Sequence, residues 1–292
     1  MITILAILGT VSLAIFGVLY SLLGYNNYFR MKVIEWMTRE ASVRGMKKED
    51  VLHGRRMYIM REDKRSVRVN YYQHQSREPV PVIFMIHGSD FASGDADDID
   101  GFCDELRKKW KMSVVSINYT KIPVHQSTYP QEEILDVIMH FSKNAAAYGM
   151  DKNRFILFGT TAGAYLAMLS SVMLVRRTVI PCGYIFCTPW IDYVQISFAR
   201  IQQHPGPVAL AASGSDRQIL DCEEYAYELD RAGMNVYMKS YADMPEDFIE
   251  KPEGLTAEQL EIRESALNIL HEDAETFFNL GRRTMAAVPV ML

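Results

Sequence analysis

The chain has 292 residues, of which 49% are hydrophobic and 23% are charged, and its formal net charge is −5 at pH 7. This composition is typical of a globular protein that can bury one substantial core. The negative charge provides no basic surface for nucleic acid, so we expect no nucleic-acid partner.

The first predicted element is a transmembrane helix over residues 1–25. Residues from Ile2 to Gly24 are nearly all apolar or small, and the first charged side chain is Arg30. A run of this length can cross a hydrocarbon core of about 30 Å. A cleaved signal peptide is the main alternative, but the run lacks a basic start and a clear cleavage site. The expected partner of this segment is therefore a membrane.

Basic side chains follow this segment, whereas only the amino terminus precedes it. They are Arg30, Lys32, Arg39, Arg44, Lys47 and Lys48. Lys and Arg hold their flank of a membrane helix in the cytoplasm. We therefore expect a single-pass membrane protein with a cytoplasmic globular domain. Residues 26–63 are predicted to be a charged, helical juxtamembrane connector or partial cap.

Residues 64–292 alternate between short β-rich runs and longer helical runs. This alternation predicts an α/β fold, with a mainly parallel sheet and helices on both faces. The predicted strands are Val67 to Tyr72, Val80 to Ile86, Ser113 to Tyr119, Phe155 to Phe158, Gly183 to Phe186, Val208 to Ala212 and Val236 to Tyr241.

Two helices are marked by their own signals. Between Pro130 and Tyr148 apolar residues recur at helical spacing, which predicts one buried stripe. A last helix has Thr256 as its N-cap and is predicted to run to about Leu280. The four cysteines do not indicate a disulfide scaffold in a chain of this length, and buried free thiols fit a cytoplasmic domain.

The segment from Arg154 to Ala167 carries the most informative motif. An apolar strand enters a Gly-x-Thr-x-Gly turn, Gly159 to Gly163, and a helix of small residues follows. This pattern is typical of the nucleophile elbow of α/β-hydrolases, with Thr161 at the position of the usual serine. Gly-Lys-Ser/Thr does not follow the turn, so it is not a phosphate-binding loop, and no cofactor is expected.

Further segments extend the pattern from Val80 to Phe248. An apolar strand ends in His87-Gly-Ser-Asp90, and Thr188-Pro-Trp-Ile-Asp192 and Tyr241-Ala-Asp-Met-Pro-Glu-Asp-Phe248 follow the elbow. The sequence here resembles the hormone-sensitive-lipase-like carboxylesterases. That family has His-Gly-Gly-Gly at the place of His87 to Asp90 and Gly-Asp-Ser-Ala-Gly-Gly at the elbow. The resemblance implies an α/β-hydrolase fold and carboxylesterase or lipase activity.

By this resemblance, Thr161 occupies the nucleophile position, Asp216 the acid position and Glu246 the histidine position. The oxyanion donors would be the backbone N–H groups of Gly88, Ser89 and Ala162. The supporting residues would be His87, which braces the oxyanion loop, and Asp90, which replaces a glycine of that loop. For Asp216 the alternative is a turn residue that caps the following helix.

Three departures from the family pattern act against ester hydrolysis. The β-methyl group of Thr161 crowds a strained turn, the Asp90 carboxylate would repel an oxyanion, and Glu246 replaces the general base. Loss of a triad histidine costs factors on the order of 10⁶ in kcat in serine proteases. His125 is the one other histidine that we place near the site. Only 12 residues separate Asp192 from Pro205, which indicates a reduced cap.

Two functions therefore remain open. The chain is either a pseudoenzyme that works as a binding or regulatory module, or an active carboxylic-ester hydrolase that uses Thr161 with a non-standard base. The expected ligand is a small ester, an acyl group or a cation, the last because Asp90, Asp216, Glu246 and Asp247 are acidic. No metal site is expected. The Asp95, Asp97, Asp98 and Asp100 cluster lacks the pattern of a calcium loop and is predicted to be a solvated helix start.

Overall fold

The computed structural model describes residues 46–88, 91, 93–121, 129–191 and 206–286. The predicted transmembrane helix over residues 1–25 lies outside these ranges, as do Ser89, Asp90, His125 and the segment of the reduced cap. No helix among the described residues is long and apolar enough to span a bilayer.

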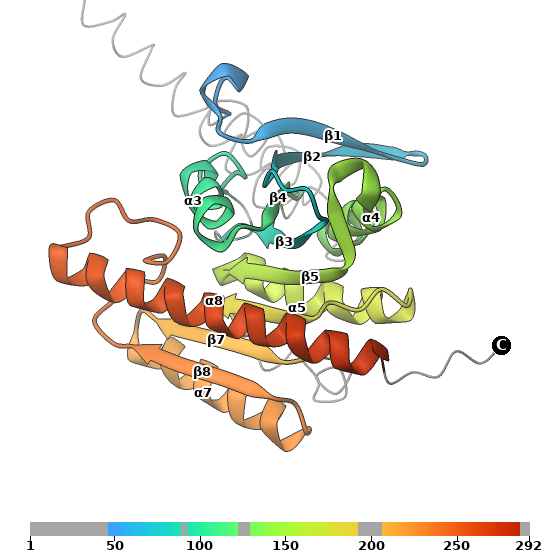
Figure 1. Cartoon of the computed structure of the whole chain (residues 1–292). Coiled ribbons are helices and arrows are strands. Elements are labelled where there is room, and N and C mark those ends of the chain that lie inside the picture. Colours follow the sequence, from blue (N-terminus) through green and yellow to red (C-terminus); the bar gives the residue numbers. More distant parts are fainter. Residues whose placement is uncertain (1–45, 89–90, 92, 122–128, 192–205, 287–292) are drawn as a thin grey trace, which may run out of the picture.

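Eight strands form one sheet in the part of the chain that the structure describes. Their order in space is β1-β2-β4-β3-β5-β6-β7-β8 (Figure 1). They are β1 (Arg55–Arg61), β2 (Lys64–Tyr72), β3 (Val80–Ile86), β4 (Ser113–Asn118), β5 (Met150–Thr160), β6 (Gly183–Cys187), β7 (Val208–Ser213) and β8 (Val236–Tyr241).

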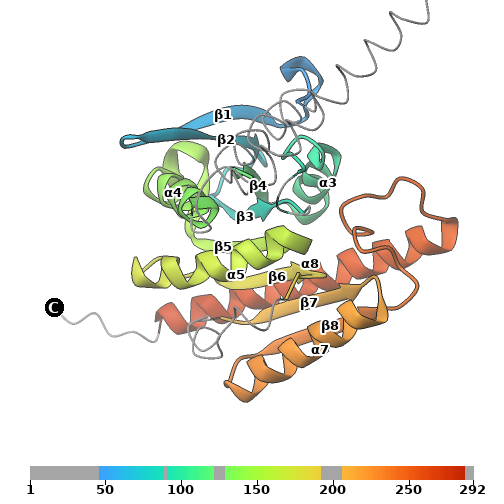
Figure 2. The ribbon, with the colours of Figure 1, turned by 180° about the vertical axis from the view of Figure 1, so that it is seen from behind.

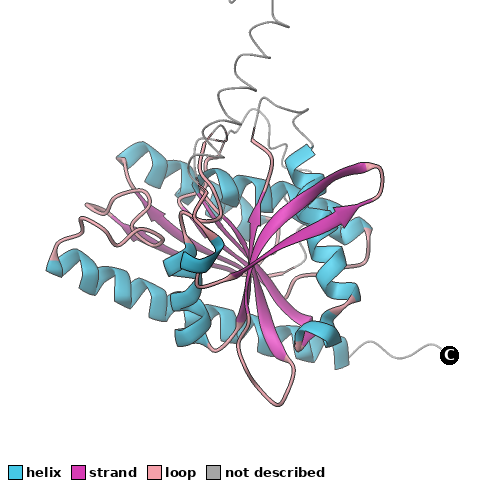
Figure 3. Cartoon of the chain, turned by 90° about the horizontal axis from the view of Figure 1, so that it is seen from above, coloured by secondary structure: helices cyan, strands magenta, loops and turns pink. Residues whose placement is uncertain are grey.

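The sheet is mainly parallel, as the alternating pattern predicts. Strand β2 pairs antiparallel with both β1 and β4, whereas the strands from β4 to β8 pair in parallel. Parallel neighbours need crossover connections, which the helices provide. Seen along the sheet, the strands fan out with the usual twist between helices on both sides (Figure 3).

The helices divide into two layers, one on each face of the sheet. On one face lie α4 (Tyr129–Lys143), α5 (Thr161–Arg176) and α7 (Asp216–Arg231), which are in front in Figure 2. On the other face lie α3 (Asp100–Trp110) and α8 (Ala257–Ala286). Alternate residues of β3 serve the two layers, because Phe84 packs in the first core and Ile83 in the second.

The described part of the predicted connector is not helical beyond one short turn. A 3-10 turn, η1 (Glu49–Val51), leads into β1, which forms a hairpin with β2. The boundary that the sequence suggested at residue 63 therefore falls inside the hairpin turn, where Asp63 has φ 52°. Strand β1 was missed because it lies at the sheet edge and exposes Tyr58 and Met60, so its pattern is not that of a buried strand.

Three of the four residues of the acidic cluster are buried, so the predicted solvated helix start is wrong for them, whereas Asp98 is exposed. Asp95, Asp97 and Asp100 are at most 4% exposed. Arg56 bonds Asp97 at 2.6 Å, Tyr72 donates to Asp100 at 2.9 Å, and Arg68 pairs with Asp95. These carboxylates tie the β1–β2 hairpin to the segment that enters α3. No metal-binding group of His, Cys, Asp or Glu occurs among the described residues.

The end of the chain follows its sequence signals. The N-terminus of α8 has a capping box, since Gln259 N donates to Thr256 Oγ1 and Thr256 N donates to Gln259 Oε1. The helix continues past Leu280 to Ala286. The other marked helix ends earlier than predicted, at Lys143, and the separate turn η2 (Ala145–Tyr148) completes the segment. All four cysteines are buried and free.

Candidate functional site

The candidate site lies where the parallel strands end. Ligands of open α/β sheets bind beside the carboxyl ends of the strands, because the connecting loops converge there. His87 and Gly88 follow β3, Thr161 follows β5, and Thr188 follows β6. The turn that carries Glu246 and Glu250 follows β8.

The turn at Thr161 has the strained geometry of a nucleophile elbow. Strand β5 ends at Thr160, helix α5 starts at Thr161, and Thr161 has φ 44°. This left-handed conformation is unusual for a β-branched residue. The structure therefore keeps the threonine in the conformation that the elbow imposes on its nucleophile, and the side chain is 5% exposed.

Glycines allow the elbow to close. A Cβ on Gly159 would lie 2.5 Å from Ala164 Cα, and a Cβ on Gly163 would overlap the carbonyl oxygen atoms of Ile86 and His87. Neither distance is tolerated by real side chains. The two glycines of the motif are thus explained by close backbone approach, within the turn and against the end of β3.

Gly88 faces the elbow hydroxyl groups and the carboxylate of Glu250. A Cβ on Gly88 would overlap Thr161 Oγ1 and would lie 2.8 Å from Thr160 Oγ1 and 2.9 Å from Glu250 Oε1. The expected role of Gly88 as an oxyanion donor stays a prediction.

Glu250 is a site residue that the sequence did not reveal. It is 5% exposed, and its Oε2 accepts a hydrogen bond from Thr160 Oγ1 at 2.5 Å. Burial raises the pKa of Glu250, while the hydrogen bond from Thr160 opposes that rise. The residue lies four positions after Glu246, in a turn with no recognisable motif at its position, so only the fold brings it to the elbow.

Glu246, at the histidine position of the family pattern, is held by Trp190. The indole Nε1 of Trp190 donates to Glu246 Oε1 at 2.9 Å, and the backbone N–H of Trp190 points to Thr161 O at 3.4 Å. The Glu246 backbone passes beside the end of β7, because its Cβ would lie 3.6 Å from a Cβ on Gly214. The segment therefore reaches the expected region, with a carboxylate in place of an imidazole.

The other predicted residues are placed only in part. Asp216 is the first residue of α7, but the cap of that helix is Ser215, which forms a capping box with Gln218. The alternative, in which Asp216 caps this helix, is therefore wrong, because the N-cap is the preceding residue, Ser215. Ala162 is buried in the first turn of α5, where backbone N–H groups lack helix partners, so its donor role stays a prediction. Ser89 and Asp90 lie outside the described residues.

His87 is buried at the end of β3, and its expected bracing of the oxyanion loop stays a prediction. It is 1% exposed, stacks on the ring of Tyr119, and has Nδ1 2.9 Å from Gly88 O. Its Nε2 lies 2.8 Å from Lys121 Nζ. An ammonium or amine donor at Nε2 leaves the proton on Nδ1, which then donates to Gly88 O. Burial lowers the pKa of His87 well below its usual value, so the ring is neutral.

Lys121 is a second residue that the sequence did not reveal. Its Nζ is buried between His87, the carbonyl oxygen of Tyr119 at 3.0 Å and the Tyr119 ring at 3.9 Å. Burial lowers the pKa of Lys121 to about 7, and the carboxylates of Asp95 and Glu133 oppose that shift. A lysine just after a strand is common, so no signal in the sequence marked it.

Three of the other described histidines have partners of their own. His53 bonds Asp100, His140 lies 3.1 Å from the Tyr148 hydroxyl, and His271 stacks on Trp110. The predicted substitute His125 lies outside the described residues. In the described ranges, then, His87 is the histidine beside the elbow, and both of its ring nitrogens are engaged.

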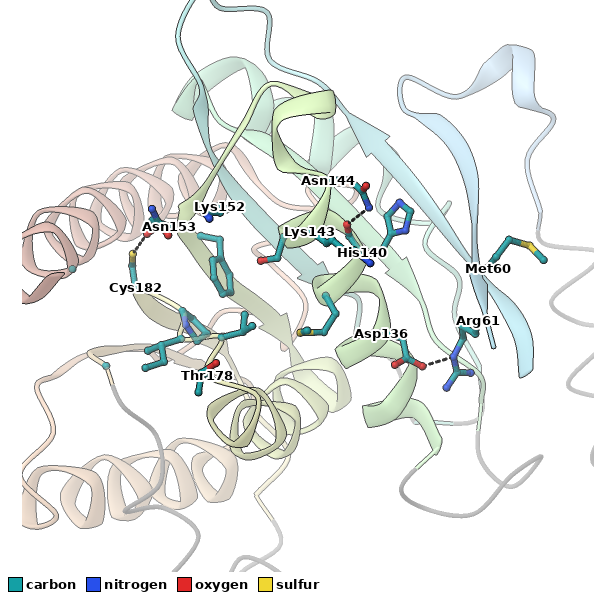
Figure 4. A pocket seen from close by; sticks show the side chains of 18 of the residues that line it. Met60, Arg61, Asp136, His140, Lys143, Asn144, Lys152, Asn153, Thr178 and Cys182 are labelled. Atoms are coloured by element: carbon teal, nitrogen blue, oxygen red, sulfur yellow. Dashed lines mark hydrogen bonds and ion pairs between the residues drawn. The ribbon is translucent and has the colours of Figure 1, made fainter. Parts of the chain in front are cut away.

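A separate cavity of about 1320 Å³ lies toward the other end of the sheet (Figure 4). Its lining includes Arg61, Asp136, Lys152 and Cys182. Because Lys152 lies near the start of β5 and Thr161 follows its end, the two places are roughly 30 Å apart along the strand. The cavity is therefore not part of the elbow site.

Comparisons with known sequences identify the same fold. A family model described as the alpha/beta hydrolase fold matches residues 83–208, which include the elbow. Human arylacetamide deacetylase-like 3 is 31% identical over 101 residues, which is 35% of this chain and 25% of that protein. The acetyl esterase of Salmonella schwarzengrund is 33% identical over 104 residues, 35% of this chain and 31% of that protein. The chain thus matches about a third or less of these relatives' length.

Solved structures agree over a larger share of the chain. The thermophilic carboxylesterase EstE1, cloned from a metagenomic library, has a TM-score of 0.67 and 15% identity, and the match covers 88% of this chain and 99% of that one. An esterase of Pyrobaculum calidifontis has a TM-score of 0.66 and 17% identity, and the match covers 85% of this chain and 92% of that one. At such identities the likeness shows the fold alone.

Proposed function

We propose that this chain, an esterase- and lipase-like α/β-hydrolase of the hormone-sensitive-lipase-like family, lacks conventional ester hydrolysis and works as a membrane-anchored binding or regulatory module. The fold and the family resemblance are the premises. The loss of turnover, the membrane anchor and the regulatory role are the proposal.

The observation that carries the proposal is the hydrogen bond between Trp190 and Glu246. In a hydrolase the residue at this position must accept the proton of the nucleophile and then release it to the leaving group. Glu246 offers a carboxylate that already accepts the indole N–H at 2.9 Å. At neutral pH a carboxylate is a far weaker base than imidazole. Glu246 would therefore be a weaker base toward Thr161 than the imidazole of the family.

The membrane anchor is supported by the sequence before the described domain. The apolar run from Ile2 to Gly24 and the basic residues after it favour a single-pass protein with a cytoplasmic domain. Such an anchor would place the site near a membrane surface, where small esters, acyl groups and cationic head groups occur. We propose ligands of these classes, with Glu246 and Asp247 as the acidic groups toward a cation.

The alternative is an active carboxylic-ester hydrolase that uses Thr161. It is favoured by the elbow itself, because Thr161 keeps φ 44° and its Oγ1 packs against Gly88. A threonine in that conformation can attack a carbonyl carbon if a base removes its proton. The alternative needs a base that is not the imidazole of the family.

Ester hydrolysis by the purified full-length chain separates the two proposals. Short-chain p-nitrophenyl esters are assayed with the unmodified protein, Thr161→Ala, Thr161→Ser and Glu246→His. We expect no turnover above the Thr161→Ala background, and a gain when Thr161→Ser and Glu246→His are combined. Turnover in the unmodified protein that disappears in Thr161→Ala would establish the alternative.

Membrane anchoring is tested separately in cells that express the full chain. Extraction by detergent, but not by salt or carbonate, is the expected result for a spanning helix. Release by carbonate would overturn the anchor without any bearing on the ester assay.

A further inference from the structure

The carboxylate of Glu250 is held at the end of β5, beside the end of β3. Its Oε2 accepts a hydrogen bond from Thr160 Oγ1 at 2.5 Å, and its Oε1 lies 2.9 Å from the position of a Cβ on Gly88. The fold therefore fixes a buried carboxylate next to the elbow.

The same carboxylate lies beside the elbow hydroxyl. A Cβ on Gly88 would lie 2.9 Å from Glu250 Oε1 and would overlap Thr161 Oγ1. These two oxygen atoms therefore face the same glycine from neighbouring directions. A negative charge on Glu250 is within short range of any charge that forms on a group attached to Thr161 Oγ1.

The surroundings of Glu250 do little to neutralise that charge. On its own turn, Lys251 lowers the pKa of Glu250, but its Nζ is bonded to Asp247 at 2.9 Å. Cys103 on α3 and Cys187 on β6 also face the carboxylate, and burial raises the pKa of both thiols, so they are neutral at pH 7. Among the described neighbours, then, Glu250 has a hydrogen-bond donor and shares the Lys251 cation with Asp247. None of them is a cation that pairs with Glu250 alone.

Ester hydrolysis needs the opposite arrangement. Its tetrahedral intermediate carries a negative oxygen, which free backbone N–H groups of the oxyanion loop must stabilise. Glu250 adds a negative charge beside the elbow hydroxyl. Its effect on an oxyanion is therefore unfavourable.

We propose that Glu250 is an internal charge lock, a carboxylate held beside the elbow that prevents the elbow from stabilising an oxyanion. The inference rests on the proposed loss of ester hydrolysis and adds a residue to it. Restoring a serine and a histidine at positions 161 and 246 would then not be enough for full reactivity. The Glu250 charge would have to be removed as well.

The test measures the reaction of the elbow hydroxyl with an alkyl fluorophosphonate in the full-length Thr161→Ser, Glu246→His variant. The introduced serine oxygen would form a bond to phosphorus, fluoride would leave, and the introduced imidazole would take the hydroxyl proton. This variant is compared with the same variant carrying Glu250→Gln. Glutamine keeps the shape and the acceptor oxygen but removes the charge. The matched control is Glu253→Gln, because Glu253 is an exposed acid three residues away.

We expect Glu250→Gln to raise the labelling rate at least about tenfold at pH 8, which corresponds to about 1.4 kcal/mol of transition-state energy. Glu253→Gln should leave the rate unchanged. Equal rates with and without Glu250→Gln, in proteins with the same thermal unfolding curve, overturn the charge lock. If Glu250→Gln does not fold, Glu250→Met takes its place with the same expectation, and a pH profile gives an independent reading.

The pH profile separates charge from bracing. Burial raises the pKa of Glu250, so this carboxylate loses its charge at a higher pH than an exposed glutamate does. The advantage of Glu250→Gln should therefore shrink toward one at acidic pH, since the histidine introduced at position 246 titrates in both proteins and cancels in the ratio. The ratio of the labelling rates with and without Glu253→Gln, both in proteins that keep Glu250, should stay constant across the same pH range. A ratio that does not change with pH would show a bracing role alone and would overturn the charge lock.

Failure of the proposed function is distinguishable from failure of the charge lock. Turnover by the unmodified chain that depends on Thr161 would remove the proposed function. In that case the unmodified chain is compared with the single variant Glu250→Gln. A lower rate of ester hydrolysis in Glu250→Gln would then overturn the charge lock as well.

Discussion

Lys121 Nζ lies 2.8 Å from His87 Nε2, and both residues are buried. Through the ring of His87 the amine is connected to Gly88 O, which His87 Nδ1 reaches at 2.9 Å. The chain Lys121, His87, Gly88 therefore fixes the tautomer of the histidine and the path of the loop after β3. Within this arrangement, the protonation of Lys121 changes with pH near neutrality.

The stability of the domain should depend on pH through Lys121. Burial lowers the pKa of Lys121 to about 7 in the folded protein, below the usual value of 10.5. Between these values the unfolded chain binds the proton and the folded chain does not, so stability rises with pH in that window. We expect Lys121→Met to lose this rise, of about 1.4 kcal/mol per pH unit at most, in urea unfolding from pH 7 to 9.5.

Lys143→Met is the matched control for Lys121, because Lys143 is an exposed lysine of α4. Its pH dependence should be the same as that of the unmodified protein. A Lys121→Met curve that runs parallel to both would show that Lys121 keeps its proton after folding.

The close approach of α5 to β3 makes Gly163 irreplaceable. A Cβ at Gly163 would overlap two backbone carbonyl oxygen atoms, which cannot rotate away. We expect Gly163→Ala to destabilise the domain by about 2–4 kcal/mol, measured by urea unfolding. Gly101→Ala in α3 is the control, since nothing lies within 4 Å of its Cβ position. It should stabilise by about 0.5–1 kcal/mol. Equal effects of the two substitutions would contradict the packing argument.

The β1–β2 hairpin depends on the buried pair of Arg56 and Asp97. The two side chains are 7% and 0% exposed, and their atoms are 2.6 Å apart. Removal of one partner leaves a buried charge, so Asp97→Asn should cost about 3–5 kcal/mol. We expect amide hydrogen exchange to become faster in residues 55–72.

Lys64→Met tests the same hairpin at an exposed pair. Lys64 bonds Glu132 at 2.8 Å, with side chains that are 43% and 35% exposed. Such a pair contributes at most about 1 kcal/mol. Unchanged hydrogen exchange in Asp97→Asn would mean that the hairpin is held by its strand pairing alone.

The N-terminus of α8 should be sensitive to the loss of its cap. Thr256 and Gln259 exchange two hydrogen bonds at 3.0 and 3.2 Å. Thr256→Ala is expected to lower the free energy of unfolding by about 1 kcal/mol. In a double-mutant cycle with Gln259→Ala the two losses should be less than additive, because each substitution removes one bond and loosens the turn that holds the other. Additive losses would show that the two bonds act independently.

Much of the architecture could be predicted from the sequence because it depends on local patterns. The buried strand Val80 to Ile86 and the strand Val236 to Tyr241 have the predicted bounds, and Thr256 caps α8 as expected. The elbow was identified from its glycines, whose positions are required by contacts within and next to one turn. Strand β1 was missed, because an edge strand with buried arginines lacks the apolar pattern of a core strand.

Charged groups were the harder part of the prediction. Asp95, Asp97 and Asp100 have the composition of a solvated segment, yet each is buried against a partner that is at least 27 residues away in the chain. Burial of a carboxylate is favourable only when donors are already in place. Those donors lie on β1 and β2, so the outcome depends on the assembled sheet.

The sequence by itself determined the fold class and the elbow turn, and it predicts that Thr161 and Glu246 stand at the serine and histidine positions of the family. These features lie within single segments or in their order along the chain. Only the tertiary structure decided which groups surround Thr161. Glu250 is 89 residues from Thr161 and Lys121 is 34 from His87. Such contacts arise when strand ends converge at one edge of the sheet, because burial and hydrogen bonding then depend on distance in space and not in sequence.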